Sequence, residues 1–176
     1  MYSEAAPLTT LLPIALFSGV TVIALVLSDY HQVRAGRYLF KPLASAAFIW
    51  FALSLHATSS AYGTWLLAAL VFCLLGDLFL MSDRERYFLA GLGAFLCGHL
   101  LFAAAFYQLP SNVMGLGITL LPALIMLVFV WRWLIPHVNR EMKGPVTLYI
   151  LVIMAMLLCA GMTAGQPAAV IIIIGA

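Results

Sequence analysis

The chain has 176 residues, of which 65% are hydrophobic and 8% charged, with a net charge of +2 and a mean hydropathy of +1.13. Ordinary globular chains are roughly half apolar and about a quarter charged, so the composition excludes a soluble domain. The small net charge, without a basic tract, gives no indication of nucleic-acid binding, and three cysteines without CxxC spacing indicate neither a disulfide framework nor a zinc site.

Six apolar stretches are long enough to cross a bilayer as helices, which takes about 18 residues or more. They lie at 8–28, 39–58, 63–81, 87–108, 113–135 and 145–163. A further apolar segment, 167–176, would make roughly 15 Å of helix, which is too short for a hydrocarbon core of about 30 Å. We therefore predict an all-α, polytopic transmembrane helix bundle with six full spans plus the start of a seventh. It forms a single integral-membrane domain over residues 1–176 that is incomplete at its C-terminus.

The positive charges predict the orientation of these spans. All Lys and Arg residues lie in or beside three alternate connections: Arg34, Arg37, Lys41, Arg84, Arg86, Arg132, Arg140 and Lys143. The positive-inside rule assigns these connections to the cytoplasm, so the N-terminus faces outward. We expect an integral protein of the bacterial inner (cytoplasmic) membrane.

One carboxylate, Asp77, interrupts the third span in the stretch LLGDLFLM. Charged groups within lipid are costly, so such a residue faces the bundle interior, where it pairs with a cation or keeps a proton. Lys41 starts the second span at a similar depth on the same side, so a pair with Asp77 is geometrically allowed. The alternatives are a purely structural Asp77 and a Lys41 whose amine extends to the lipid headgroups.

His99 lies about 18 Å into the fourth span, near the membrane midplane, where it needs a hydrogen-bond partner or a wet cavity. It stands beside a face of small residues, Ala90, Ala94 and Gly98, which would let another helix approach closely. A helix–helix contact is the plainer alternative to a functional role. No metal site is visible, and no cofactor is expected.

Three stretches, in this order, resemble a known pattern: FKPL at 40–43, LLGDLFLM at 74–81 and GLGAFLCGHLLF at 91–102. They look like the YhhN-like family of lysoplasmalogenases, which are polytopic membrane proteins with about eight spans. The resemblance implies hydrolysis of the vinyl ether bond of lysoplasmalogens, with release of a fatty aldehyde and a glycerophospho-ethanolamine or -choline. It matches the motif aspartate to Asp77 and also covers Gly76, Lys41, Pro42 and His99. The family has a second aspartate after the segment matching IIIIGA, and we expect this chain to be truncated before it.

The chemistry of vinyl ether hydrolysis indicates which roles these residues would have. The slow step protonates carbon and produces an oxocarbenium ion, which water then captures. Burial favours the protonated form of a carboxyl group, and a second carboxylate can orient the water, much as in glycosidases. We expect Asp77 to be this acid or its base partner, His99 to order water or support Asp77, and Lys41 to hold the phosphate of the lysophospholipid substrate.

Two other classes of function remain open from the residues. In a small proton-coupled transporter, Asp77 and His99 would relay protons, and uptake would depend on a pH gradient without lipid cleavage. In a non-enzymatic lipid-binding membrane subunit, the small-residue face at 90–98 would mediate assembly, and Asp77→Asn would change stability but no turnover. Headgroup preference and oligomeric state are not indicated by the sequence.

Overall fold

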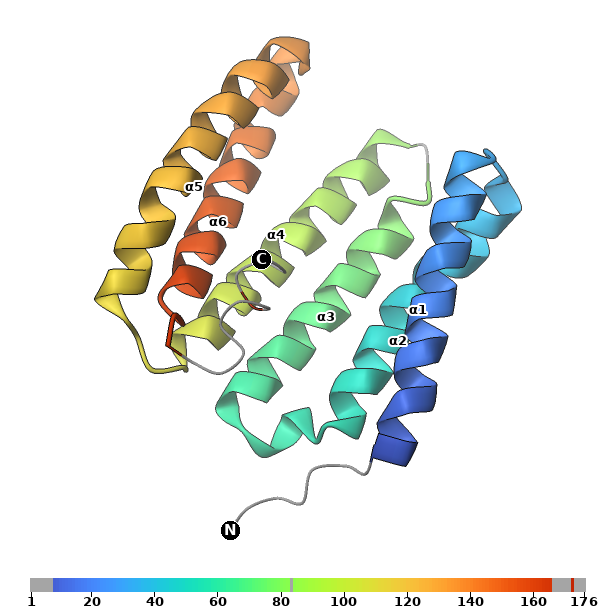
Figure 1. Ribbon diagram of the computed structural model, residues 1–176. Helices are drawn as coiled ribbons and strands as arrows, with labels where there is room; N and C mark the ends of the chain where they lie inside the picture. Colours follow the sequence, from blue (N-terminus) through green and yellow to red (C-terminus); the bar gives the residue numbers. More distant parts are fainter. Residues whose placement is uncertain (1–7, 83, 166–171, 173–176) are drawn as a thin grey trace. The chain divides into compact units, whose positions relative to one another are not determined.

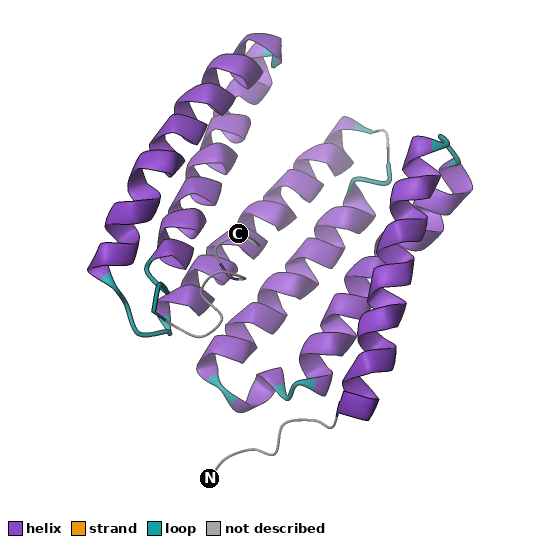
Figure 2. Ribbon diagram, viewed as in Figure 1, coloured by secondary structure: helices purple, strands orange, loops and turns teal. Residues whose placement is uncertain are grey.

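The computed structural model describes residues 8–82, 84–165 and 172, and within these ranges it contains helices and no strand (Figures 1 and 2). The six α-helices are α1 (Leu8–Tyr30), α2 (Arg34–Ser54), α3 (Ala61–Phe79), α4 (Glu85–Tyr107), α5 (Val113–Leu134) and α6 (Lys143–Gly161). Three short 3₁₀ helices, η1 (Ala57–Ser59), η2 (Ile135–His137) and η3 (Arg140–Met142), lie in the connections. The predicted all-α fold is confirmed.

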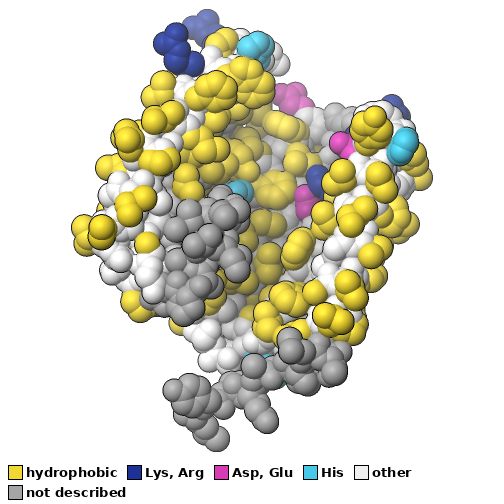
Figure 3. Space-filling view, in the orientation of Figure 1, with side chains coloured by type: hydrophobic (Ala, Val, Ile, Leu, Met, Phe, Trp, Pro, Cys, Tyr) yellow, Lys and Arg dark blue, Asp and Glu magenta, His cyan; other side chains and the backbone are white. Residues whose placement is uncertain are grey.

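In the part of the chain that the structure describes, five helical segments are long and apolar enough to cross a membrane, and α2 is the α-helix outside this group. Its first eight residues include Arg34, Arg37 and Lys41, which lower its hydropathy. Hydrophobic side chains cover much of the visible helix surfaces, as expected for contact with lipid (Figure 3). The chain is therefore a helical membrane bundle, as predicted.

The second span begins earlier than the sequence indicated. We expected it to start at residue 39, with Lys41 at its beginning, whereas α2 starts at Arg34. Lys41 consequently lies about two turns inside α2. The prediction of this boundary was wrong because charged residues in a first helical turn were taken for a connection.

The chain divides into two compact units, Met1–Gly98 and His99–Ala176, with α4 contributing to both. In the first unit, α1 packs along α2 and α2 packs along α3. Small residues of α2 and α3 are buried there, namely Ala44, Ala47, Ala52, Gly63, Ala69 and Gly76. Such residues let helix backbones approach closely within a membrane. The prediction of a single domain stays a prediction.

Within the first unit, α4 approaches α3 through glycines. A Cβ on Gly98 would lie 3.0 Å from the Cys73 sulfur and 3.3 Å from the Ala69 carbonyl oxygen. A Cβ on Gly91 would lie 2.8 Å from Cγ of Leu80. The predicted small-residue face is thus present at Ala94 and Gly98, which are buried, but Ala90 is exposed and Gly91 is the residue in contact.

The second unit packs α5 against α6. Asn112 caps α5 through its side-chain oxygen, which accepts from Met114 N at 2.9 Å. It also reaches the chain after α6, where its backbone N–H donates to the Met162 oxygen at 2.7 Å and its side-chain amide to the Ala164 oxygen at 2.9 Å. The predicted start of a seventh span lies outside the described residues, apart from Ile172.

Candidate active site

Asp77 lies in the last turn of α3, which ends at Phe79. The C-terminal end of a helix carries partial negative charge, so a carboxylate is disfavoured there unless a cation accompanies it. Lys41 of α2 supplies that cation, with its Nζ 3.2 Å from Asp77 Oδ1. Both side chains are largely withdrawn from solvent, with exposed fractions of 17% for Asp77 and 32% for Lys41. The pair that the sequence allowed is therefore present.

Ser45 completes the surroundings of the Asp77 carboxylate. Its hydroxyl donates a hydrogen bond to Asp77 Oδ2, so both carboxylate oxygens have a partner on α2. Sequence reasoning missed Ser45. The available signal was its spacing from Lys41, because residues four apart lie on the same face of a helix.

This ion pair bears on the expected role of Asp77. Opposite charges attract strongly at such a distance in a poorly solvated site, and the ammonium and hydroxyl groups both match a carboxylate. Both oxygens of the Asp77 side chain therefore have a partner on α2. The role of Asp77 as acid or base partner stays a prediction.

A cavity of about 560 Å³ adjoins Lys41 where the connection between α1 and α2 meets the end of α3. Its lining is Leu25, Val26, Asp29, Arg34, Arg37, Tyr38, Lys41, Leu80 and Met81. Three cations and one carboxylate thus share one space with apolar side chains. The lining is suited to an amphiphile that carries a phosphate group.

Two contacts shape this basic cavity. Arg37 Nη1 lies 3.4 Å from Asp29 Oδ1, in a pair whose side chains are both exposed. The Tyr38 hydroxyl donates to the Met81 backbone oxygen at 2.9 Å and so joins α2 to the chain after α3. Neither Asp29 nor Tyr38 was singled out from the sequence. Tyr38 precedes Lys41 by three residues on α2, so helix spacing was an available signal, whereas the position of Asp29 depends on how α1 packs on α2.

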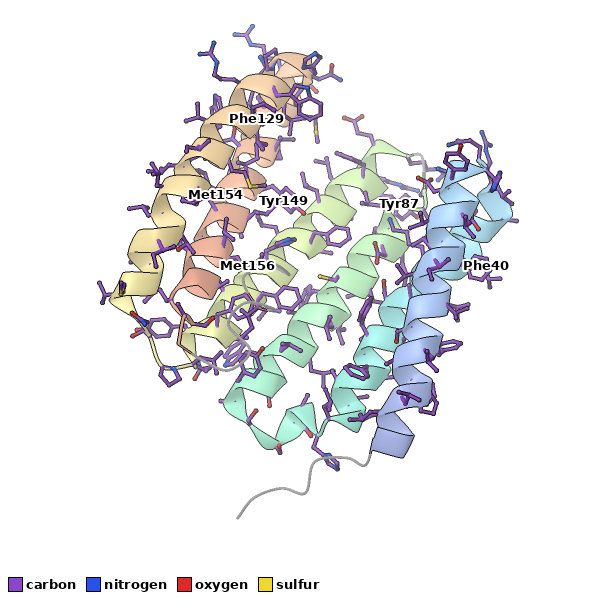
Figure 4. All side chains as sticks on the ribbon, viewed as in Figure 1. Phe40, Tyr87, Phe129, Tyr149, Met154 and Met156 are labelled. Atoms are coloured by element: carbon purple, nitrogen blue, oxygen red, sulfur yellow. The ribbon has the colours of Figure 1, made fainter. Side chains whose placement is uncertain are left out.

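A second, more open hollow of about 540 Å³ shares Tyr38 and Met81 with the basic cavity. Its other lining residues are Leu78, Phe79, Ser82, Arg84 and Tyr87. Tyr87, labelled in Figure 4, stacks on Phe79 with a centroid distance of 6.4 Å, and the Arg86 guanidinium lies 5.0 Å from the Tyr87 ring. The aromatic faces here are therefore already in contact with protein groups.

The sequence matches the YhhN family over residues 36–176. The chain belongs to the YhhN family. The match begins in the first turn of α2 and includes Lys41, Asp77 and His99. Comparisons with curated proteins and with solved structures found no match.

Gly76 and His99 are the remaining predicted residues of this YhhN-family protein. Gly76 is buried, and a Cβ on it would lie 2.7 Å from the Phe95 ring, so its position fits helix packing. His99 belongs to the second unit, where its ring lies edge-on to Tyr149 of α6, with centroids 5.3 Å apart (Figure 4 labels Tyr149). A role for His99 in supporting Asp77 stays a prediction.

Across the part of the YhhN-family protein that the structure describes, no three His, Cys, Asp or Glu side chains are grouped closely enough to hold a metal ion.

Proposed function

We propose that this YhhN-family protein hydrolyses the vinyl ether bond of lysoplasmalogen and releases a fatty aldehyde and a glycerophospho-ethanolamine or -choline. The observation that carries the proposal is the position of the Asp77–Lys41 pair, because Lys41 also lines the basic cavity. The cavity can take the phosphate. Asp77 is not among the described residues that line the cavity, and its contact with Lys41 links it to that lining.

The substrate's own dimensions support this arrangement. Three glycerol carbons separate the phosphate ester oxygen from the vinyl ether oxygen, so both groups fit within one cavity of this size. The phosphate binds Arg34 and Arg37, since guanidinium groups favour multidentate contacts with phosphate. The alkenyl chain follows the apolar lining residues, Leu25, Val26 and Leu80, toward the lipid.

The reaction adds one water molecule across the vinyl ether. A proton is added to the double-bond carbon that does not carry the ether oxygen. This leaves an oxocarbenium ion at the carbon bonded to that oxygen. Water attacks that carbon, and the resulting hemiacetal releases the glycerol hydroxyl and the aldehyde. Asp77 as a carboxylate stabilises the cation and accepts a proton from the attacking water, as carboxylates do in glycoside hydrolysis. With Asp77 as the base, the first proton comes from a second carboxyl group, and the family resemblance implies a second aspartate.

Lys41 and Ser45 hold the Asp77 carboxylate in place for this step. Their contacts to separate oxygens restrict rotation of the carboxylate, and a fixed geometry contributes strongly to catalysis. Lys41 thereby connects phosphate binding with the reacting group, because it contacts Asp77 and lines the cavity.

The test is release of aldehyde from lysoplasmalogen by membranes that contain the full-length protein. We expect Asp77→Asn to reduce the rate about 100-fold or more, which is the usual contribution of a positioned acid or base. Glu85→Gln is the matched control, because Glu85 is an exposed carboxylate in the first turn of α4, outside both hollows. Undiminished activity in Asp77→Asn, with both variants inserted equally well, would remove Asp77 from the mechanism.

A further inference from the structure

The basic cavity carries a charge pattern that distinguishes between lysolipid headgroups. We propose that it binds a zwitterionic headgroup with a primary amine, so that the substrate is an ethanolamine lysolipid in preference to a choline one. Asp29 binds the amine, and Arg34 and Arg37 bind the phosphate. This inference rests on the proposed function and specifies its substrate.

The charges in the cavity divide into two groups. Lys41 is engaged by Asp77, and that pair is largely withdrawn from solvent. Arg37 and Asp29 form a single 3.4 Å contact between exposed side chains, which is a weak interaction that a ligand can replace. Among the described residues, no carboxylate lies within ion-pair distance of Arg34. The exposed part of the cavity therefore presents two guanidinium groups and one carboxylate.

A phosphoethanolamine group matches this arrangement. It carries a negative phosphate and a positive amine separated by two carbons. The phosphate can therefore bind Arg37 and the amine can bind Asp29, in place of the contact between these two side chains. The amine donates hydrogen bonds to the Asp29 carboxylate, and such charge-assisted bonds are stronger than neutral ones.

A choline group matches the cavity less well. Its trimethylammonium has no N–H to donate, so Asp29 would lose its Arg37 partner and gain no hydrogen bond in return. Quaternary ammonium groups are usually held by several aromatic faces, and among the described residues that line the cavity Tyr38 alone is aromatic. The neighbouring hollow has more aromatic side chains, but Phe79, Tyr87 and Arg86 contact one another there.

The experiment compares kcat/KM for ethanolamine and choline lysoplasmalogens with the same alkenyl chain, using the full-length protein in membranes. We expect the wild type to favour the ethanolamine substrate, and Asp29→Asn to lower the ratio of the two values about tenfold or more, as expected for loss of a charge-assisted hydrogen bond. Asp29→Glu, which keeps the carboxylate, should retain the preference. Equal values for both substrates in the wild type, or a ratio unchanged in Asp29→Asn, would overturn the inference.

A binding measurement separates this inference from the proposed function. Thermal shifts are recorded with lysophosphatidylethanolamine, lysophosphatidylcholine and soluble phosphoethanolamine, which have no vinyl ether to cleave. Greater stabilisation by the ethanolamine lysolipid, lost in Asp29→Asn, supports the inference even if the wild type cleaves neither lysoplasmalogen and the proposed function fails. Stabilisation by soluble phosphoethanolamine as well would support it and assign recognition to the headgroup alone. Equal shifts with the two lysolipids would contradict it.

Discussion

The Asp77–Lys41 pair makes a quantitative prediction about stability. At the observed 3.2 Å, with an effective dielectric constant of about 20, the Coulomb attraction is about 5 kcal/mol. The free-energy cost of removing both charged groups from water opposes this attraction. Exposed pairs contribute about 0.2–1 kcal/mol, and breaking a fully buried pair costs about 3–5 kcal/mol. Since the two side chains are 17% and 32% exposed, we expect a coupling of about 1–3 kcal/mol.

A double-mutant cycle measures this coupling. Lys41→Met, Asp77→Asn and the double variant are unfolded by titration with sodium dodecyl sulfate from mild detergent, with helix content followed by circular dichroism. Each single substitution should lower the free energy of unfolding, and the double variant should be more stable than the sum of the two losses predicts. A coupling below about 0.5 kcal/mol would show that the charges do not interact as the geometry indicates.

Three further predictions follow from the packing and the cavity. Gly91→Ala should lower the free energy of unfolding by about 1–3 kcal/mol in the same titration, because its Cβ would meet Leu80. Gly93→Ala is the control and should be neutral or stabilising, because a Cβ there would have no atom within 4 Å. Equal losses in the two variants would contradict the close approach of α4. Ser45→Ala should lower kcat about tenfold with little change in KM, and an unchanged kcat would exclude Ser45 as a positioning residue. Arg34→Gln should raise KM for lysoplasmalogen more than it lowers kcat, and kinetics like those of the wild type would exclude a phosphate contact.

Much of the architecture could be predicted because a bilayer restricts the possible structures. Long apolar stretches must form helices, so the six predicted spans correspond to the six α-helices. The start of α2 was misplaced because its first turn is charged, and hydropathy cannot separate a charged helix end from a connection. Glycine contacts were less predictable, since α4 carries several small residues and only its packing on α3 determines that Gly91 is in contact and Ala90 is not.

The charged residues of the candidate site could be predicted from the sequence, but the polar residues around them could not. Asp77 and Lys41 stand out because an isolated charge in an apolar span needs a partner. Ser45 does not stand out, since a serine in a helix commonly bonds to its own backbone and is compatible with many environments. Asp29 could not be assigned because its place in the cavity depends on how α1 packs on α2. The Tyr38 contact with Met81 could not be predicted because the two residues are 43 positions apart.

Isotope labelling tests the central claim most directly. Membranes with the full-length protein are incubated with lysoplasmalogen in D₂O, and the released aldehyde is reduced at once to an alcohol and examined by mass spectrometry. Protonation at carbon predicts one deuterium on the carbon next to the former carbonyl, formed rapidly by the wild type and only slowly by Asp77→Asn. Aldehyde without deuterium at that carbon, or equal rates for the two proteins, would contradict the account.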